Sequence, residues 1–145
     1  MPLVAPTDVQ AVLAAGKDYD SDLNPDLTPY INAADGMVQQ VVQCAARRGV
    51  TLTPTQQAVI EAWLAAHLYC MSDQTYRART TSKASGQFGG DWGLNLDGTK
   101  YGQSAAMYDI SGCLNAYGKR LAARAAWLGK NRSTMIPVDE RALPQ

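Results

Sequence analysis

The sequence lacks the features that mark membrane and secreted proteins. Its longest apolar run, from Ala62 to Ala66, stops at His67, far short of the ~18 apolar residues typical of a membrane span. The opening residues, MPLVAPTDVQ, contain no basic segment followed by an apolar one, as a secretory signal would. We therefore expect a protein that is made in the cytoplasm and has no membrane partner.

Cysteine is scarce and odd in number. Cys44, Cys70 and Cys113 are widely spaced, whereas the disulfide frameworks of small secreted domains use even numbers of cysteines. We expect buried thiols. Together with His67 they could form a Cys₃His zinc set, but no two of the cysteines have the short spacing of a structural zinc site. A histidine hydrogen-bonded in the core is the favoured interpretation, and we predict no metal.

Catalytic and nucleotide-binding motifs are also missing. With a single histidine, an enzyme would need His67 to activate a nucleophile such as Ser72, Ser104 or Cys113, and no motif marks one. The segment GLNLDGTK, residues 93–100, approaches a phosphate-binding loop, but its lysine follows the threonine instead of preceding it. We predict no catalytic residue and no cofactor.

The net charge is zero, yet the two signs are separated along the chain. Residues 1–35 contain six acidic residues and one lysine, and residues 119–145 contain six basic and two acidic ones. If these ends lie on opposite sides of the fold, the separation suits head-to-tail contact between identical copies. The alternative is that both are ordinary solvated termini.

Nucleic-acid binding predicts a basic stripe with interleaved aromatic residues. The sequence offers two modest candidates, and its neutral total argues against tight binding to DNA. They are Tyr76 with Arg77, Arg79 and Lys83, and the basic C-terminal cluster with Trp127.

The length of 145 residues indicates one domain, and capping signals predict three helices in its first half. A short helix has Thr7 as N-cap and Gly16 as terminator. A second begins at Thr28 and ends at Gly49, and a third follows Thr53. The second has an apolar face at Ile31, Ala34, Val38, Val41 and Ala45. The third, which we expect at the centre of the core, has Ile60, Trp63, Leu64, His67, Cys70 and Met71 on its inward side.

A fourth helix is predicted from Thr99 or Gln103 to beyond Leu121, although it contains glycines that cost ~0.5–1 kcal/mol each in a helix interior. Its apolar face is Ala106, Ile110, Cys113, Leu114, Tyr117 and Leu121. Ala105, Gly112, Ala116 and Ala123 form a second stripe of small residues. Gly112 and Ala116 would allow a neighbouring element, from this chain or another copy, to approach closely.

Between the third and fourth helices, residues 80–98 have no helical period and are rich in glycine. Phe88, Trp92, Leu94 and Leu96 are spaced so that the second half alternates like a strand, which predicts a loop or β-hairpin. We therefore expect a mainly α fold: a bundle of four to five helices in one domain, residues 1–130, with this excursion at 80–98. Residues 131–145 are expected to form an extended arm.

Two segments resemble a known family. VIEAWLAAHLYCMSD, residues 59–73, followed by DGTKYGQSAAMYDISGCL, residues 97–114, are similar to the head-to-tail connector (adaptor) proteins of tailed bacteriophages. The AAWLGK stretch at residues 125–130 resembles the element that closes the family's last main helix. The long FGGDWGLNLDG loop and the tail after Arg132 depart from the family pattern.

The resemblance implies a virion structural protein without catalytic chemistry, located at the neck, at the portal vertex. Such adaptors form a ring, commonly of twelve copies, that docks on the portal protein and presents a surface to a stopper, a tail terminator or the tail. DNA passes through the channel without specific binding. The residues that we expect at contacts with other copies or the portal are Phe88, Trp92, Leu94, Leu96, Tyr101, Gly112, Ala116, Ile136, Val138 and Arg141.

Two other functions compete with this one. The first is a small helical DNA-binding or packaging accessory protein, which would bind duplex DNA in a strongly salt-dependent way. The second is a tail-completion or stopper subunit, which would attach below the adaptor. For the loop aromatics, the alternative to an interface is that they fold back as a small satellite core.

Overall fold

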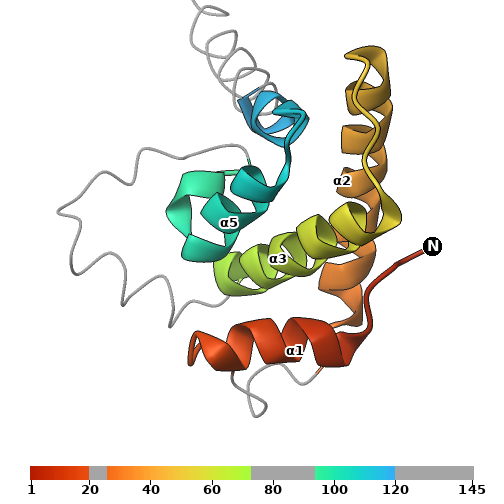
Figure 1. Cartoon of the computed structure of the whole chain (residues 1–145). Helices are drawn as coiled ribbons and strands as arrows, with labels where there is room; N and C mark the ends of the chain where they lie inside the picture. The colour runs from red at the N-terminus through yellow and green to blue at the C-terminus, as the bar shows by residue number, and fades with distance from the viewer. Residues whose placement is uncertain (20–25, 73–93, 120–145) are drawn as a thin grey trace, which may run out of the picture.

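A central helix organises the molecule in the computed structural model, which describes residues 1–19, 26–72 and 94–119. Helix α3 (Pro54–Ser72) packs against α1 (Pro6–Ala15), α2 (Thr28–Arg47) and α5 (Lys100–Tyr108). Figure 1 shows these three helices arranged around α3. The short 3₁₀ helix η1 (Leu96–Gly98) leads into α5, and another helix begins at residue 113 and is described to residue 119. The described residues are thus mainly helical, as predicted, and contain no strand.

Helix α2 has the predicted boundaries and the predicted face. It begins at Thr28 with proline in its first turn, and Gly49 follows its end with φ of 75°. Val50 N donates to Ala45 O at 2.9 Å, which satisfies one of the last carbonyls of the helix. Its buried residues are the five that the spacing predicts: Ile31, Ala34, Val38, Val41 and Ala45.

Helix α3 is the centre of the core, as predicted. Thr53 and Gln56 cap its start reciprocally: Gln56 N donates to Thr53 Oγ1 at 3.3 Å, and Thr53 N donates to Gln56 Oε1 at 2.9 Å. The helix is buried on more sides than the predicted inward face, because it is packed against three other helices. Trp63 is only half-buried, and Glu61 is fully buried.

Helix α1 begins one residue before its predicted cap. Pro6 is the first helical residue, and Ala5 N donates to the Asp8 carboxylate at 3.0 Å. Gly16 ends the helix as predicted, but the left-handed residue after it is Lys17, with φ of 59°. Val9 and Leu13 are buried.

The strand alternation predicted over Leu94 and Leu96 is wrong. Asn95 has φ of 41°, and residues 96–98 form the 3₁₀ turn η1, so the backbone here is not extended. Both leucines are buried in the core. The rest of the predicted hairpin, residues 80–93, and the arm at residues 131–145 lie outside the described residues.

The predicted fourth helix is in fact two helices. Helix α5 ends at Tyr108, residues 109–112 form a turn, and the next helix begins at residue 113. Gly112 has φ of 67° in this turn, a conformation that is readily adopted by glycine and that an uninterrupted helix excludes. Ile110, predicted on the apolar face, is consequently 65% exposed.

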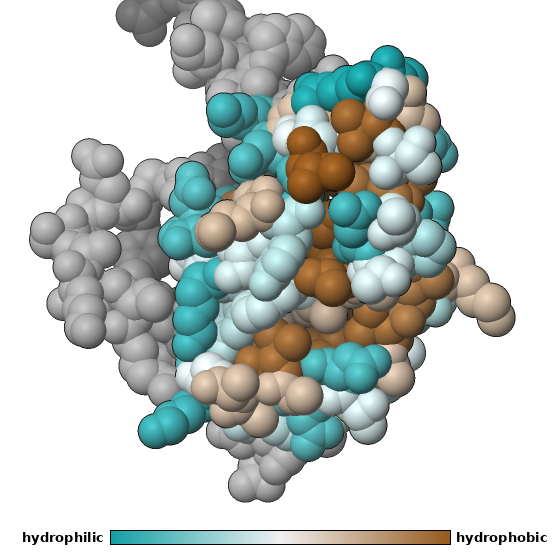
Figure 2. Space-filling view, viewed as in Figure 1, coloured by the Kyte–Doolittle hydropathy of each residue, from teal (hydrophilic) through white to brown (hydrophobic). Residues whose placement is uncertain are grey.

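The surface of the bundle alternates between polar and apolar areas. Figure 2 shows apolar residues reaching the surface in separate areas of this face, with polar residues between them. Within the described part of the chain, no helix is both long and apolar enough to span a membrane.

Candidate functional site

The junction between α3 and the start of α5 contains a buried polar network. The side chain of His67 lies between two partners from the segment before α5: its Nδ1 is 2.7 Å from Thr99 Oγ1, and its Nε2 is 2.7 Å from Leu94 O. Gly102 N donates to Thr99 Oγ1 at 2.9 Å, which makes Thr99 the side-chain cap of α5. His67 and Thr99 are almost completely buried.

These contacts fix the tautomer of His67. The carbonyl of Leu94 can only accept, so Nε2 carries the proton and Nδ1 accepts from the Thr99 hydroxyl. Burial lowers the pKa of His67, and the hydrogen bond to Leu94 O opposes that shift. The neutral imidazole therefore fastens the chain before α5 to the central helix, as the favoured interpretation of this histidine predicted.

Gly102 fits the same junction because it has no side chain. A Cβ atom at this position would lie 2.3 Å from Leu96 O and 2.7 Å from His67 Nδ1. The backbone oxygen belongs to η1, so relieving the contact would require the turn to move. The glycine at position 102 is thus explained by the close approach of η1 and His67 within one chain.

Tyr101 and Lys100 connect the same segment to the end of α1. The Tyr101 hydroxyl donates to Asp18 Oδ2 at 2.6 Å, and Lys100 Nζ lies 2.8 Å from the same oxygen. Lys100 Nζ also donates to Gly16 O at 3.1 Å. The lysine of the sequence that approaches a phosphate loop is therefore engaged with Asp18.

An aromatic row runs from this buried junction to the surface. Tyr101 is buried, Trp63 is half-buried and Tyr108 is half-exposed. The ring centroid of Trp63 is 6.0 Å from that of Tyr101 and 6.1 Å from that of Tyr108. The row ends beside Met107 and Ile110, which are 83% and 65% exposed. We call Met107, Tyr108 and Ile110 the exposed end of α5.

The turn after α5 is built around Asp109. Its carboxylate accepts from Ser111 N at 3.0 Å and from Leu114 N at 2.7 Å, so the side chain caps the helix that begins at residue 113. Arg48, at the end of α2, donates through Nη1 to Ser111 O at 2.8 Å. Residues 109–114, DISGCL, thus form the turn between the two helices and the cap of the second one.

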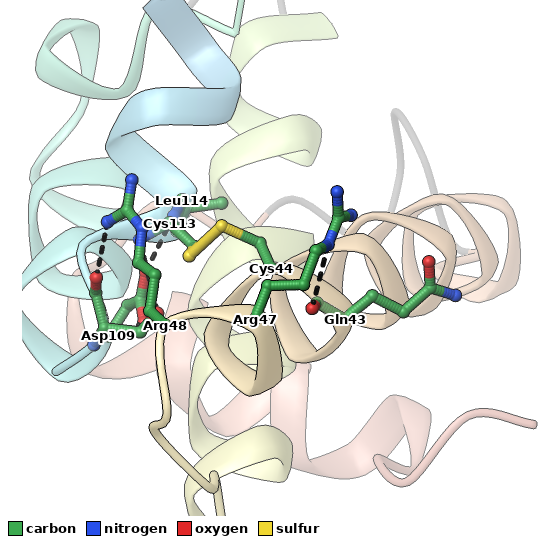
Figure 3. The surroundings of a disulfide bond; sticks show 8 residues. Gln43, Cys44, Arg47, Arg48, Asp109, Cys113 and Leu114 are labelled. Atoms are coloured by element: carbon green, nitrogen blue, oxygen red, sulfur yellow. Dashed lines mark hydrogen bonds between the residues drawn. A yellow bond between two sulfur atoms is a disulfide. The ribbon is translucent and has the colours of Figure 1, made fainter.

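A disulfide between Cys44 and Cys113 corrects the expectation of three buried thiols. Figure 3 shows this disulfide between the end of α2 and the start of the helix that begins at residue 113. It lies beside Arg48 and the capping contact of Asp109 with Leu114. The two cysteines are 69 positions apart, and only the turn at 109–112 brings the second one back to α2. Cys70 takes no part in this bond and is buried in α3.

Glu61 is a buried carboxylate on the central helix. Both of its oxygens accept from Leu3 N at 3.2 Å, which attaches the segment before α1 to α3. Burial raises the pKa of Glu61, whereas the amides of Leu3 and Val4 lower it. Its hydrogen bonds account for its position as an anchor of the N-terminal segment.

The polar groups of these sites are directed at one another. Among the described residues, every buried side-chain nitrogen or oxygen has a hydrogen-bond partner, and no three His, Cys, Asp or Glu residues are grouped as metal ligands would be. The arrangement can hold segments in register and present the exposed end of α5.

The structure places the predicted interface residues in three different settings. Leu94, Leu96 and Tyr101 are buried in the core of the chain. Gly112 is exposed and Ala116 is half-buried, on either side of the start of the last described helix. The other predicted residues lie outside the described residues: Phe88, Trp92, Ile136, Val138 and Arg141.

Sequence reasoning missed the exposed end of α5. Met107 and Tyr108 are adjacent apolar residues outside the predicted apolar stripe, and this is a signal that could have identified them. Ile110 fits the stripe only if the helix continues through residue 112, which it does not. Comparisons of this chain with protein families, curated proteins and solved structures find no match.

Proposed function

We propose that this chain is a virion structural protein of a tailed bacteriophage, an adaptor subunit that assembles as a ring beneath the portal. The ring would extend the DNA channel and join the capsid to the next connector or to the tail. The protein is made in the host cytoplasm and acts at the neck of the particle.

One observation carries this proposal: the two segments that resemble the connector family interlock in space. His67, from the LAAHL stretch, accepts a hydrogen bond from the hydroxyl of Thr99 in the TKYGQ stretch. Gly102 allows η1 and His67 to approach α5 closely. Because each segment fits the other residue by residue, their joint presence in the sequence reflects one structural unit.

The exposed end of α5 is our candidate for a subunit contact. A ring built head to tail requires two different surfaces on each copy. Apolar side chains are presented to solvent by Met107, Tyr108 and Ile110. The ring of Trp63 stacks on that of Tyr108. We propose that a neighbouring copy covers them, since exposed apolar groups that cluster mark interaction sites.

The remaining predicted contacts belong to this proposal as well. The glycine-rich loop at residues 80–98, through Phe88 and Trp92, would reach a neighbouring copy. An extended arm at residues 131–145, with Ile136, Val138 and Arg141, would contact the portal. Basic residues at 119–145 would face the acidic residues at 1–35 of the next copy.

The test is the mass of the purified chain, alone and mixed with the portal protein of the same virus, by light scattering and negative-stain imaging. We expect a ring, either alone or on the portal. The triple variant Met107→Ser, Tyr108→Ser, Ile110→Ser should not assemble. Ala46→Ser, at an exposed position of α2 outside the segments proposed to contact other copies, is the control and should assemble normally.

A chain that stays monomeric and does not bind the portal protein would contradict the proposal. If that monomer also bound duplex DNA with an affinity that fell steeply with salt, the packaging accessory protein would replace it. Binding to an assembled adaptor ring from another source, but not to the portal, would instead indicate the stopper.

A further inference from the structure

The disulfide joins the end of α2 to the helix that begins at Cys113. Among the described residues, α2 packs on α3, and α5 packs on α3 and η1. The helix that begins at Cys113 follows α5 after the turn and is attached to the end of α2 by the Cys44–Cys113 bond. The hydrogen bond from Arg48 to Ser111 O connects the same two regions.

The two cysteines differ in their exposure to solvent. Cys113 is 1% exposed, whereas Cys44 in α2 is half-buried. Arg47 and Arg48 follow Cys44 by three and four positions, so they lie on the same side of the helix, and both are exposed. Their positive charges attract an anionic thiolate that approaches Cys44.

We propose that the Cys44–Cys113 disulfide is a reversible redox link, opened through Cys44, that determines whether the helix beginning at Cys113 is held to α2. An external dithiol supplies the electrons. One of its thiolates attacks Sγ of Cys44, a mixed disulfide forms, and Sγ of Cys113 leaves as a thiolate. The second thiol then attacks the mixed disulfide and releases Cys44. The dithiol is oxidised to a disulfide, and the two cysteines gain two electrons and two protons.

Opening the link has a local consequence. The capping contacts of Asp109 lie within the turn and the helix that follows it, so this helix keeps its start when the bond is broken. The helix is then held by the Arg48 hydrogen bond and by the packing of Leu114 and Tyr117 against the core. Because cytosolic thiols are kept reduced and disulfides persist in oxidising surroundings, the helix is held less firmly in the first setting and more firmly in the second.

Hydrogen exchange of the full chain, oxidised and after treatment with dithiothreitol, tests the local effect. We expect amides in residues 109–119 to exchange about tenfold faster or more after reduction, while those of α3 keep their protection. Alkylation and mass analysis of the same samples verify which cysteines are reduced. Unchanged exchange at 109–119, or loss of protection throughout α1, α2 and α3, would overturn the proposal in favour of a purely structural cross-link.

The site of attack is tested with variants in which one of the two bonded cysteines is replaced. In Cys113→Ser, Cys44 should form a mixed disulfide with oxidised glutathione about tenfold faster than Cys113 does in Cys44→Ser. The unmodified oxidised chain, in which Cys70 is the cysteine outside the disulfide, gives the background uptake at Cys70. Equal rates at the two positions would contradict entry through Cys44. Protection of α3 amides verifies that each variant is folded, and chemical reduction of the unmodified chain provides the measurement if a variant is not.

Discussion

Helix α2 and the segment 94–119 both belong to the same bundle, but they are held by different means. Every buried side chain of α2 is aliphatic. The buried residues of 94–119 include Thr99, Gly102, Asp109 and Ser111, each placed by a specific hydrogen bond or by close approach of backbone.

The comparison shows what each kind of packing tolerates. Aliphatic packing depends on volume and burial, so similar side chains can substitute for one another at modest cost. The fit around Thr99 and Gly102 depends on single atoms in fixed positions, so even small changes alter it. Five measurements would break or sharpen this difference.

The largest loss is expected from truncation in the aliphatic core. Leu64→Ala removes a fully buried side chain from α3 and should lower the free energy of unfolding by about 3 kcal/mol. Urea denaturation measures it. Leu68→Ala on the same helix, where the side chain is half-buried, should cost clearly less. Equal losses would show that burial in this helix does not determine stability.

Gly102→Ala should destabilise by roughly 2 kcal/mol, because the new Cβ overlaps Leu96 O and His67 Nδ1. The matched control is Gly36→Ala in α2, where a Cβ meets nothing within 4 Å. That change should stabilise by ~0.5–1 kcal/mol through helix propensity. If both substitutions had the same sign, close approach at Gly102 would not be the constraint.

Thr99→Val keeps the shape of the side chain and removes the hydroxyl. Gly102 N–H and His67 Nδ1 then lose their buried partner, and we expect a loss of about 1.5 kcal/mol in chemical denaturation. Thr99→Ser retains the hydroxyl and should recover most of it. A serine variant as unstable as the valine variant would assign the effect to the methyl group.

Tyr101→Phe removes the hydrogen bond to Asp18 and leaves the aromatic row intact. The expected loss is about 1 kcal/mol. A double-mutant cycle with Asp18→Asn isolates this contact. The double mutant should lose less stability than the sum of the losses in the two single mutants. Strict additivity would mean that the hydroxyl and the carboxylate do not contribute through each other.

The mildest perturbation is pH. Because the pKa of His67 is lowered in the folded protein, the unfolded chain binds the proton more readily. The stabilising contribution is fully present above 6.5 and is lost as pH falls below it, through the folded pKa. Urea denaturation from about pH 8 to about pH 5.5 should show this decline, and a His67→Gln variant should flatten it. Glu61, whose pKa burial raises above 4.5, acts with the opposite sign: its contribution is fully present below 4.5 and is lost as pH rises through the folded pKa.

The candidate site was predictable only in part. The T-x-YGQ stretch was identified, but as the entry to one long helix; its role in binding His67 required the contact between α3 and residue 99. The exposure of Ile110 followed from the break at residues 109–112, which side-chain periodicity does not detect. Two cysteines predicted as thiols proved to be bonded, because their proximity arises from that same turn.

The sequence by itself determined α2, the start of α3 and the central place of α3. Threonine-proline starts, a terminating glycine and apolar residues at spacings of three and four act within one helix, so they can be read locally. Tertiary structure decided the contacts of Gly102, Cys44 and Cys113. Their partners lie in other segments of the chain, and the free energy that places them arises only when those segments meet around α3.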